Sequence, residues 1–128
     1  IVNVGSRDLF LTAKHVGKTF EAVYAADRIA ADLDGVAKEL RELAAGVPSV
    51  WIDLDVDAFD PAFLPGVCEP MPFGLSPHQF LALVQAIGFE KLAGFSISEF
   101  APGRDVRDAS LNLLGWLLEW VLGKKSST

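Results

Sequence analysis

Four aspartates lie within eight residues of one another, directly after the apolar run Val50-Trp51-Ile52. They are Asp53, Asp55, Asp57 and Asp60. In an extended strand the first three share one face, with neighbours roughly 6.6 Å apart at ~3.3 Å per residue. Carboxylates this close repel one another, and bound divalent cations neutralise such a cluster. The spacing therefore indicates either a cation site or a turn whose solvated aspartates cap backbone amides, and spacing alone leaves both open.

Composition describes a globular chain. Its 128 residues are 51% hydrophobic and 22% charged, which suits one domain or a piece of one and argues against disorder. The formal net charge of −6 disfavours nucleic acid and anionic membranes as partners, because no basic stripe is present. The longest apolar run, 113–122, is shorter than the ~20 residues of a membrane span. We expect neither nucleic acid nor membrane as a partner.

The single cysteine, Cys68, excludes an internal disulfide and is compatible with a reducing compartment, so a cytoplasmic protein is expected. The chain begins with Ile1 inside an apolar stretch that is typical of a strand. This start favours a fragment of a longer protein.

Strand-like and helix-like segments alternate along the chain. Ser76 and Pro77 are typical of a helix start, and Gly88 of its end. The predicted strands are 1–4, 19–24, 50–54 and 92–98, and the predicted helices are 6–15, 27–45, 77–87 and 106–122, the last capped by Asp105. The apolar residues of the last helix indicate a core or subunit interface. This alternation predicts an α/β fold with a mostly parallel sheet flanked by helices.

Acidic residues stand at the ends of separate predicted strands. Asp55 and Asp57 end one, Glu99 follows another, and Arg7-Asp8 ends a third. Ligands of parallel α/β sheets bind beyond the carboxyl ends of the strands. Convergence of these acids at one edge favours the metal-site interpretation over simple amide capping.

Several motifs together carry a family resemblance. The segments are 55–61 (Asp-Val-Asp-Ala-Phe-Asp-Pro), 63–66 (Phe-Leu-Pro-Gly), 72–76 (Pro-Phe-Gly-Leu-Ser), 4–8 (Val-Gly-Ser-Arg-Asp) and 94–102, which includes Ser-Glu-Phe-Ala-Pro. Together they resemble the ureohydrolases, the family of arginase, agmatinase and formimidoylglutamase. The resemblance implies an arginase-like α/β/α fold. It also implies hydrolysis of C–N bonds in linear amidines, with guanidino or formimino substrates, by two Mn²⁺ ions that share a hydroxide.

The resemblance assigns roles to three residues. Asp55 matches the carboxylate that bridges the two metals, and Asp57 matches one that chelates a single metal, so both count as metal ligands and catalytic residues. Glu99 matches the acid that faces the substrate's guanidinium. Asp60 is expected to stabilise a turn. The sequence departs from the family pattern at Phe73, where relatives have glycine, and at two further positions: Asp53 replaces a small hydroxyl residue, and Ser96 replaces an aspartate.

The remaining ligands of the family, two histidines and two aspartates, belong to Gly-Gly-Asp-His and Asp-Ala-His-x-Asp motifs that are absent here. His15 and His78 are expected to be surface or helix residues. Residues 1–128 are therefore interpreted as the C-terminal portion of a single ureohydrolase-like domain. By itself it should be incomplete, inactive and weak in binding Mn²⁺. The expected partners are the missing N-terminal half, a small guanidino or formimino substrate, and further copies in a homo-oligomer.

Three other interpretations fit parts of the sequence. A haloacid-dehalogenase-like phosphatase fits Asp53-Leu54-Asp55, but Asp57 stands where Thr or Val is expected and no later acidic pair is evident. A calcium-binding loop starting at Asp53 fails because Ala58 replaces the required glycine and Leu64 the required glutamate. A non-catalytic fragment or assembly module with a partial metal site remains open.

Overall fold

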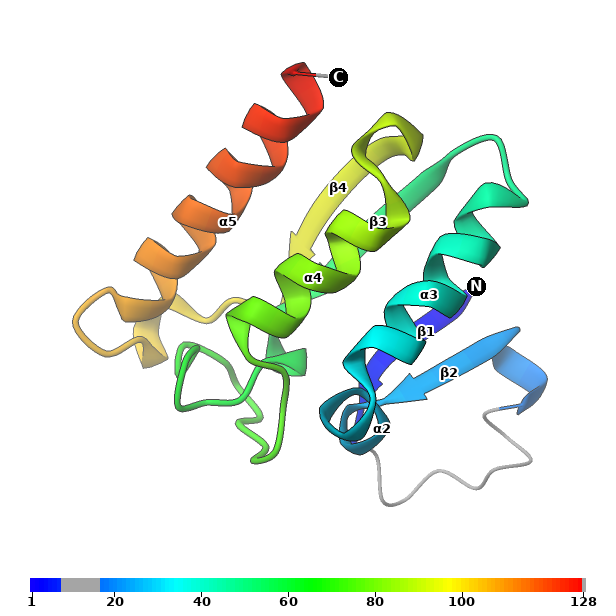
Figure 1. Cartoon of the computed structure of the whole chain (residues 1–128). Helices are drawn as coiled ribbons and strands as arrows, with labels where there is room; N and C mark the ends of the chain where they lie inside the picture. Colours follow the sequence, from blue (N-terminus) through cyan, green and yellow to red (C-terminus); the bar gives the residue numbers. More distant parts are fainter. Residues whose placement is uncertain (8–16, 128) are drawn as a thin grey trace.

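The computed structural model describes residues 1–7 and 17–127, with strands and helices in the alternation expected of an α/β protein (Figure 1). The expected helix over 6–15 falls almost entirely outside the described residues. The described elements, in chain order, are β1 (Val2–Ser6), β2 (Ala22–Ala25), α2 (Ala26–Ala31), α3 (Leu33–Ala45), β3 (Val50–Asp55), the 3₁₀ turn η1 (Val56–Ala58), α4 (Pro77–Ile87), η2 (Phe89–Lys91), β4 (Leu92–Ser98), η3 (Pro102–Arg104) and α5 (Ala109–Ser126).

The strands pair in parallel, as the sequence predicts. β1 pairs with β2 and β3 pairs with β4, so the described residues form two parallel two-stranded sheets. In the second sheet Asp53 lies opposite Ser96 and Asp55 opposite Ser98. This register brings the carboxyl ends of β3 and β4 to the same edge, where the acidic residues begin.

The apolar core joins the strands to the helices that cover them. Phe80 of α4 packs edge-on against Phe59, at 5.5 Å between ring centroids, and against Phe95 of β4 at 6.4 Å. Leu54 of β3 and Val36 of α3 belong to the same buried cluster. Helices α3 and α4 pack against each other and run side by side in Figure 1. The core therefore anchors β3, whose carboxyl end leads into η1, the acidic turn that contains Asp57.

Helix α4 has the predicted bounds, because its end signals are local. The Ser76 hydroxyl accepts a hydrogen bond from the Gln79 amide (3.2 Å), and the Gln79 side chain accepts one from the Ser76 amide (2.8 Å). Pro77 takes the first helical position, where its missing N–H costs nothing. Gly88 follows with a φ of 92°, a left-handed conformation that favours glycine.

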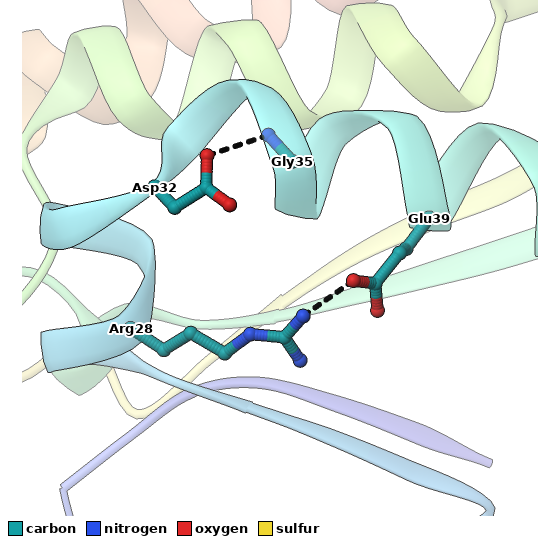
Figure 2. Close-up of polar contacts among 4 residues, drawn as sticks. All are labelled: Arg28, Asp32, Gly35 and Glu39. Carbon is teal, nitrogen blue, oxygen red and sulfur yellow. Dashed lines mark hydrogen bonds and ion pairs between the residues drawn. The ribbon is translucent and has the colours of Figure 1, made fainter.

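The prediction of one helix over 27–45 is wrong, because the chain breaks at Asp32 into α2 and α3. The Asp32 carboxylate accepts a hydrogen bond from the Gly35 amide at 3.0 Å and so caps α3 (Figure 2). Arg28 of α2 forms an ion pair with Glu39 of α3 and lies 5.0 Å from the ring centroid of Tyr24. Buried residues continue with helical spacing across the break, so periodicity alone does not reveal it.

Several further boundaries differ from the predictions, among them β1, which extends to Ser6, and α5, which extends to Ser126. The strand expected over 19–24 is β2 at Ala22–Ala25, and Thr19 is helical. The last helix begins at Ala109 rather than Val106, because Arg107 and Asp108 have left-handed φ values of 54° and 56°. Asp105 nevertheless accepts hydrogen bonds from the amides of its first turn, at Ser110 and Leu111. The capping role of Asp105 was therefore predicted correctly, but the turn at Arg107 and Asp108 was not.

Helix α5 places only one side in the core. Leu114, Leu117 and Val121 are buried, whereas Trp116 is 72% exposed and Leu122 is also exposed. Of the two alternatives predicted for this helix, core applies to its buried side, whereas a subunit interface and self-association stay predictions. Within residues 1–7 and 17–127, no helix is long and apolar enough to cross a membrane.

The proline-containing segment 60–75 has no helix or strand of its own, yet Leu64 within it is fully buried. We expect Leu64→Ala to lower the free energy of unfolding by about 2–5 kcal/mol, because it leaves a cavity in a packed core. Leu111→Ala makes the same change at a side chain that is 53% exposed, and should cost less than about 1 kcal/mol. Urea unfolding of the two variants checks this. Equal losses would contradict the anchoring of the segment by Leu64.

Candidate functional site

The acidic edge begins where β3 ends. Asp55 is the last residue of β3, and η1 starts at the next residue and turns the chain sharply. The Asp55 carboxylate accepts a hydrogen bond from the Asp57 amide at 3.3 Å, which fixes the start of that turn. Glu99 directly follows β4, whose last residue, Ser98, lies opposite Asp55. Two parallel strands therefore deliver Asp55 and Glu99 to the same edge.

The ionisation of Asp57 depends on its acidic neighbours. Partial burial raises the pKa of Asp57, and the charge and hydrogen bonding of Asp55 raise it further. Glu99 acts in the same direction, whereas Arg7 opposes it. Asp55 and Glu99 thus both lie within electrostatic reach of Asp57, and a cation beside Asp57 would relieve this repulsion. All three offer carboxylate oxygens, which suit a hard divalent cation.

The Asp53 carboxylate has a hydrogen-bond partner on the neighbouring strand. The Ser96 hydroxyl donates a hydrogen bond to the Asp53 carboxylate at 2.5 Å and accepts one from the Trp51 indole N–H at 3.1 Å. The indole ring lies against Gly94, where an added Cβ would be 2.4 Å from it. Asp53 and Ser96 are two of the positions where the sequence departs from the ureohydrolase pattern, and the structure joins them in one hydrogen bond.

Asp60 organises the loop that follows. Its carboxylate accepts hydrogen bonds from the amides of Ala62 (2.9 Å), Phe73 (2.7 Å) and Gly74 (3.3 Å). The bond from the Ala62 amide is the largest of the effects that hold the pKa of Asp60 below its usual value. The expectation that Asp60 stabilises a turn is confirmed. Phe73 has a left-handed φ of 63° and a highly exposed side chain.

The sequence does not reveal the role of Arg7. Its guanidinium donates hydrogen bonds to the backbone carbonyls of Asp57, Phe59 and Met71, although these residues are 50 to 64 positions away in the chain. The motif at 4–8 is the one signal that marks Arg7, and it says nothing of these partners. Asp8, which was expected beside Arg7 at the acidic edge, lies outside the described residues.

A complete metal shell is not formed by the described residues. No three His, Cys, Asp or Glu side chains among residues 1–7 and 17–127 form a group able to hold a metal ion. His78 is an exposed residue of α4, as expected, and His15 lies outside the described residues. The carboxylates present suit part of a cation site.

The family model of the arginase family matches residues 1–122 of the chain. The chain belongs to the arginase family. Formimidoylglutamase of Halobacterium salinarum is 34% identical over 107 residues, which are 80% of this chain and 35% of that protein. Proclavaminate amidinohydrolase of Streptomyces clavuligerus is 40% identical over 68 residues, which are 53% of this chain and 21% of that protein.

Solved structures of arginase-family proteins share this fold. Proclavaminate amidinohydrolase of Streptomyces clavuligerus superposes with a TM-score of 0.82 and 30% identity, over 97% of this chain and 41% of that one. An arginase of Bacillus subtilis gives a TM-score of 0.82 and 26% identity, over 97% of this chain and 47% of that one. The chain therefore has the arginase-family α/β fold but spans less than half the length of these relatives.

Asp60 makes a pH-dependent contribution to stability. Because the pKa of Asp60 is lowered from 3.8 in the folded state, its charge stabilises the fold above about pH 4. That contribution is lost as the pH falls through the lowered pKa. We expect Asp60→Asn to lower the melting temperature at pH 7, and expect the difference from the unaltered protein to shrink steadily below about pH 4.

Thermal unfolding between pH 2 and pH 7 measures this difference. Asp108→Asn is the matched control, because it removes one negative charge from a side chain that caps no helix amide. Asparagine also tolerates the left-handed backbone at that position. A difference in melting temperature between Asp60→Asn and the unaltered protein that does not change with pH would contradict this role of Asp60.

Proposed function

We propose that this chain is the part of a Mn²⁺-dependent amidinohydrolase that supplies Asp55 and Asp57 to two metal ions and Glu99 to the substrate. One observation supports this above the others. Asp55 ends β3, Asp57 follows in η1 and Glu99 follows β4, so all three stand at the same edge of the strand pair, whereas Asp53 is engaged by Ser96. Family membership supports the reaction class, hydrolysis of a C–N bond in a linear amidine.

The two aspartates would act through their oxygens. Asp55 leaves β3 at its carboxyl end and would bridge the ions, and Asp57, in the following turn, would chelate one of them. Two Mn²⁺ ions, when bound, lower the pKa of a water molecule and so supply a nucleophile near neutral pH. The crowding that makes the carboxylates repel one another in the bare protein would then favour cation binding.

Glu99 would bind the substrate rather than metal. A carboxylate facing a planar amidinium group forms charge-assisted hydrogen bonds with it and orients the carbon that is attacked. Glu99 has a left-handed φ of 63°, which a non-glycine residue adopts rarely. A strained backbone held at the edge of the candidate site supports a functional role for this residue.

The complete site would require residues outside this chain. Asp55 and Asp57 supply only part of two coordination shells, and the chain spans 35% of its formimidoylglutamase relative. We therefore propose that the missing ligands come from an N-terminal half, and that neither half is active by itself. The substrate would be a small guanidino or formimino compound.

The first test uses ligand variants of the complete protein, with this chain and its N-terminal half together. Asp55→Ala and Asp57→Ala should each lower the amount of bound Mn²⁺. Each should also lower kcat/KM by more than about 100-fold, because losing a metal ligand should cost more than losing an outer-shell partner, which costs about 10- to 100-fold. Glu99→Gln should keep its Mn²⁺ and lower kcat/KM by about 10- to 100-fold, because it loses one charged hydrogen-bond partner.

Asp53→Asn is the matched control on the same strand, because it keeps an oxygen that accepts from Ser96. It should retain both Mn²⁺ and activity. Metal content by elemental analysis, measured beside kcat/KM, separates the three roles. A Glu99→Gln protein that loses Mn²⁺, or an Asp55→Ala protein that keeps both ions, would contradict the assignment.

The second test concerns the reaction itself. With the N-terminal half restored by co-expression or in one polypeptide, the protein should hydrolyse a guanidino or formimino substrate only when Mn²⁺ is present. Arginine, agmatine and formimidoylglutamate are the substrates to assay, with urea or formamide as the measured product. Each half alone serves as the control and should be inactive. No turnover of these compounds or of simpler guanidines at full Mn²⁺ occupancy would sink the proposal.

A further inference from the structure

We propose that Arg7 is a positioning residue for the metal-binding carboxylates, because its guanidinium holds the turn that carries Asp57. The inference rests on the proposed function, since it concerns the same site. It assigns a role to a residue that need not touch either metal or substrate.

The contacts of Arg7 link two separate segments. One guanidinium nitrogen donates to the carbonyls of Phe59 at 3.2 Å and Met71 at 2.9 Å, and the other donates to the carbonyl of Asp57. Asp57 and Phe59 flank the end of η1, whereas Met71 belongs to the loop stabilised by Asp60. Arg7 itself directly follows β1, which pairs with β2 in the other sheet. The acidic turn is therefore braced from the end of a different strand pair.

The Asp57 backbone is consequently held from both sides. Its amide donates to the Asp55 carboxylate at 3.3 Å, and its carbonyl accepts from Arg7. These two bonds restrict the rotation of the peptide units on either side of the Asp57 Cα. The direction in which the Asp57 side chain leaves the turn depends on both, and metal ligation tolerates only small errors in that direction.

Arginine suits this role for a second reason. These three hydrogen bonds go to carbonyl oxygens rather than to carboxylates, so they occupy no oxygen that Asp55 or Asp57 would offer to a cation. Its positive charge nevertheless lies beside these acids and reduces their mutual repulsion. A planar guanidinium can donate in several directions at once, whereas a lysine ammonium is a point charge on a flexible stem.

Gly74 shows how closely the loop packs on this guanidinium. A Cβ added at Gly74 would lie 2.0 Å from the Arg7 guanidinium nitrogen and 2.4 Å from the Asp60 amide. No side chain fits in that space, so the loop backbone closes over the half-buried arginine. The guanidinium is thus held between the acidic turn and the loop. A side chain of different shape at position 7 should therefore shift the backbone of Asp57.

The test compares Arg7→Lys with the unaltered complete protein. We expect Mn²⁺ to bind about 10- to 100-fold more weakly, the range for losing an outer-shell partner of a metal site. The ion that Asp57 chelates should be lost first, so binding should separate into a tighter and a weaker step. Electron paramagnetic resonance of free Mn²⁺ during titration gives both affinities and the stoichiometry. The Mn²⁺-induced rise in melting temperature is measured in parallel, because it reports binding by folded molecules.

Arg28→Lys is the matched control. The Arg28 guanidinium also joins two segments, because it forms an ion pair with Glu39 and lies over the Tyr24 ring. Neither of these partners belongs to the acidic edge. Its replacement should leave both Mn²⁺ affinities unchanged. Arg7→Gln, which keeps an amide donor and loses the charge, should weaken Mn²⁺ binding at least as much as Arg7→Lys.

Each outcome is decisive. If both Arg7 variants bind the two Mn²⁺ ions with affinities within about twofold of those of the unaltered protein, the role of Arg7 is merely structural and the inference is overturned. The proposed function stays intact in that case. Equal weakening in Arg28→Lys would overturn it as well. If the unaltered complete protein binds no Mn²⁺, the proposed function and this inference fail together.

Discussion

The parallel pairing of two strands is the constraint on which the candidate site depends. Parallel pairing of β3 and β4 places Asp55 and Glu99 together, and η1 adds Asp57 beside them. Partial burial raises the pKa of Asp57, and its acidic neighbours Asp55 and Glu99 raise it further. A fold built for stability alone has no need to concentrate charge in this way, because like charges placed close together repel one another.

The surrounding loops hold the charged edge with backbone groups. Asp60 accepts hydrogen bonds from three amides of the loop, and Arg7 donates to three carbonyls of the turn and loop. The two side chains thus carry opposite charges and satisfy opposite kinds of backbone group. Together these hydrogen bonds hold the backbone of the turn and of the loop.

Local signals explain the elements that were predicted well. Helix α4 and strand β4 have the predicted bounds, and a capping box, a proline and the following glycine define α4 within a few residues. The split at Asp32 was missed, because Ile29 and Val36 stay buried with helical spacing on both sides of the break. At Asp32 the chain forms a side-chain cap instead of continuing as one helix. The spacing of apolar residues does not reveal which of these two structures is favoured.

The sequence by itself determined which residues could do chemistry: the types and spacing of Asp55, Asp57 and Glu99, their places at the strand ends, and the membership of the arginase family. These are local properties, since a strand end and an adjacent acid are neighbours in the chain. Only the tertiary structure decided that Asp53 is bound to Ser96, 43 residues away, and that Arg7 reaches carbonyls 50 to 64 residues away. Such partners depend on strand register and on how a loop closes over a side chain, and neither leaves a periodic trace in the sequence.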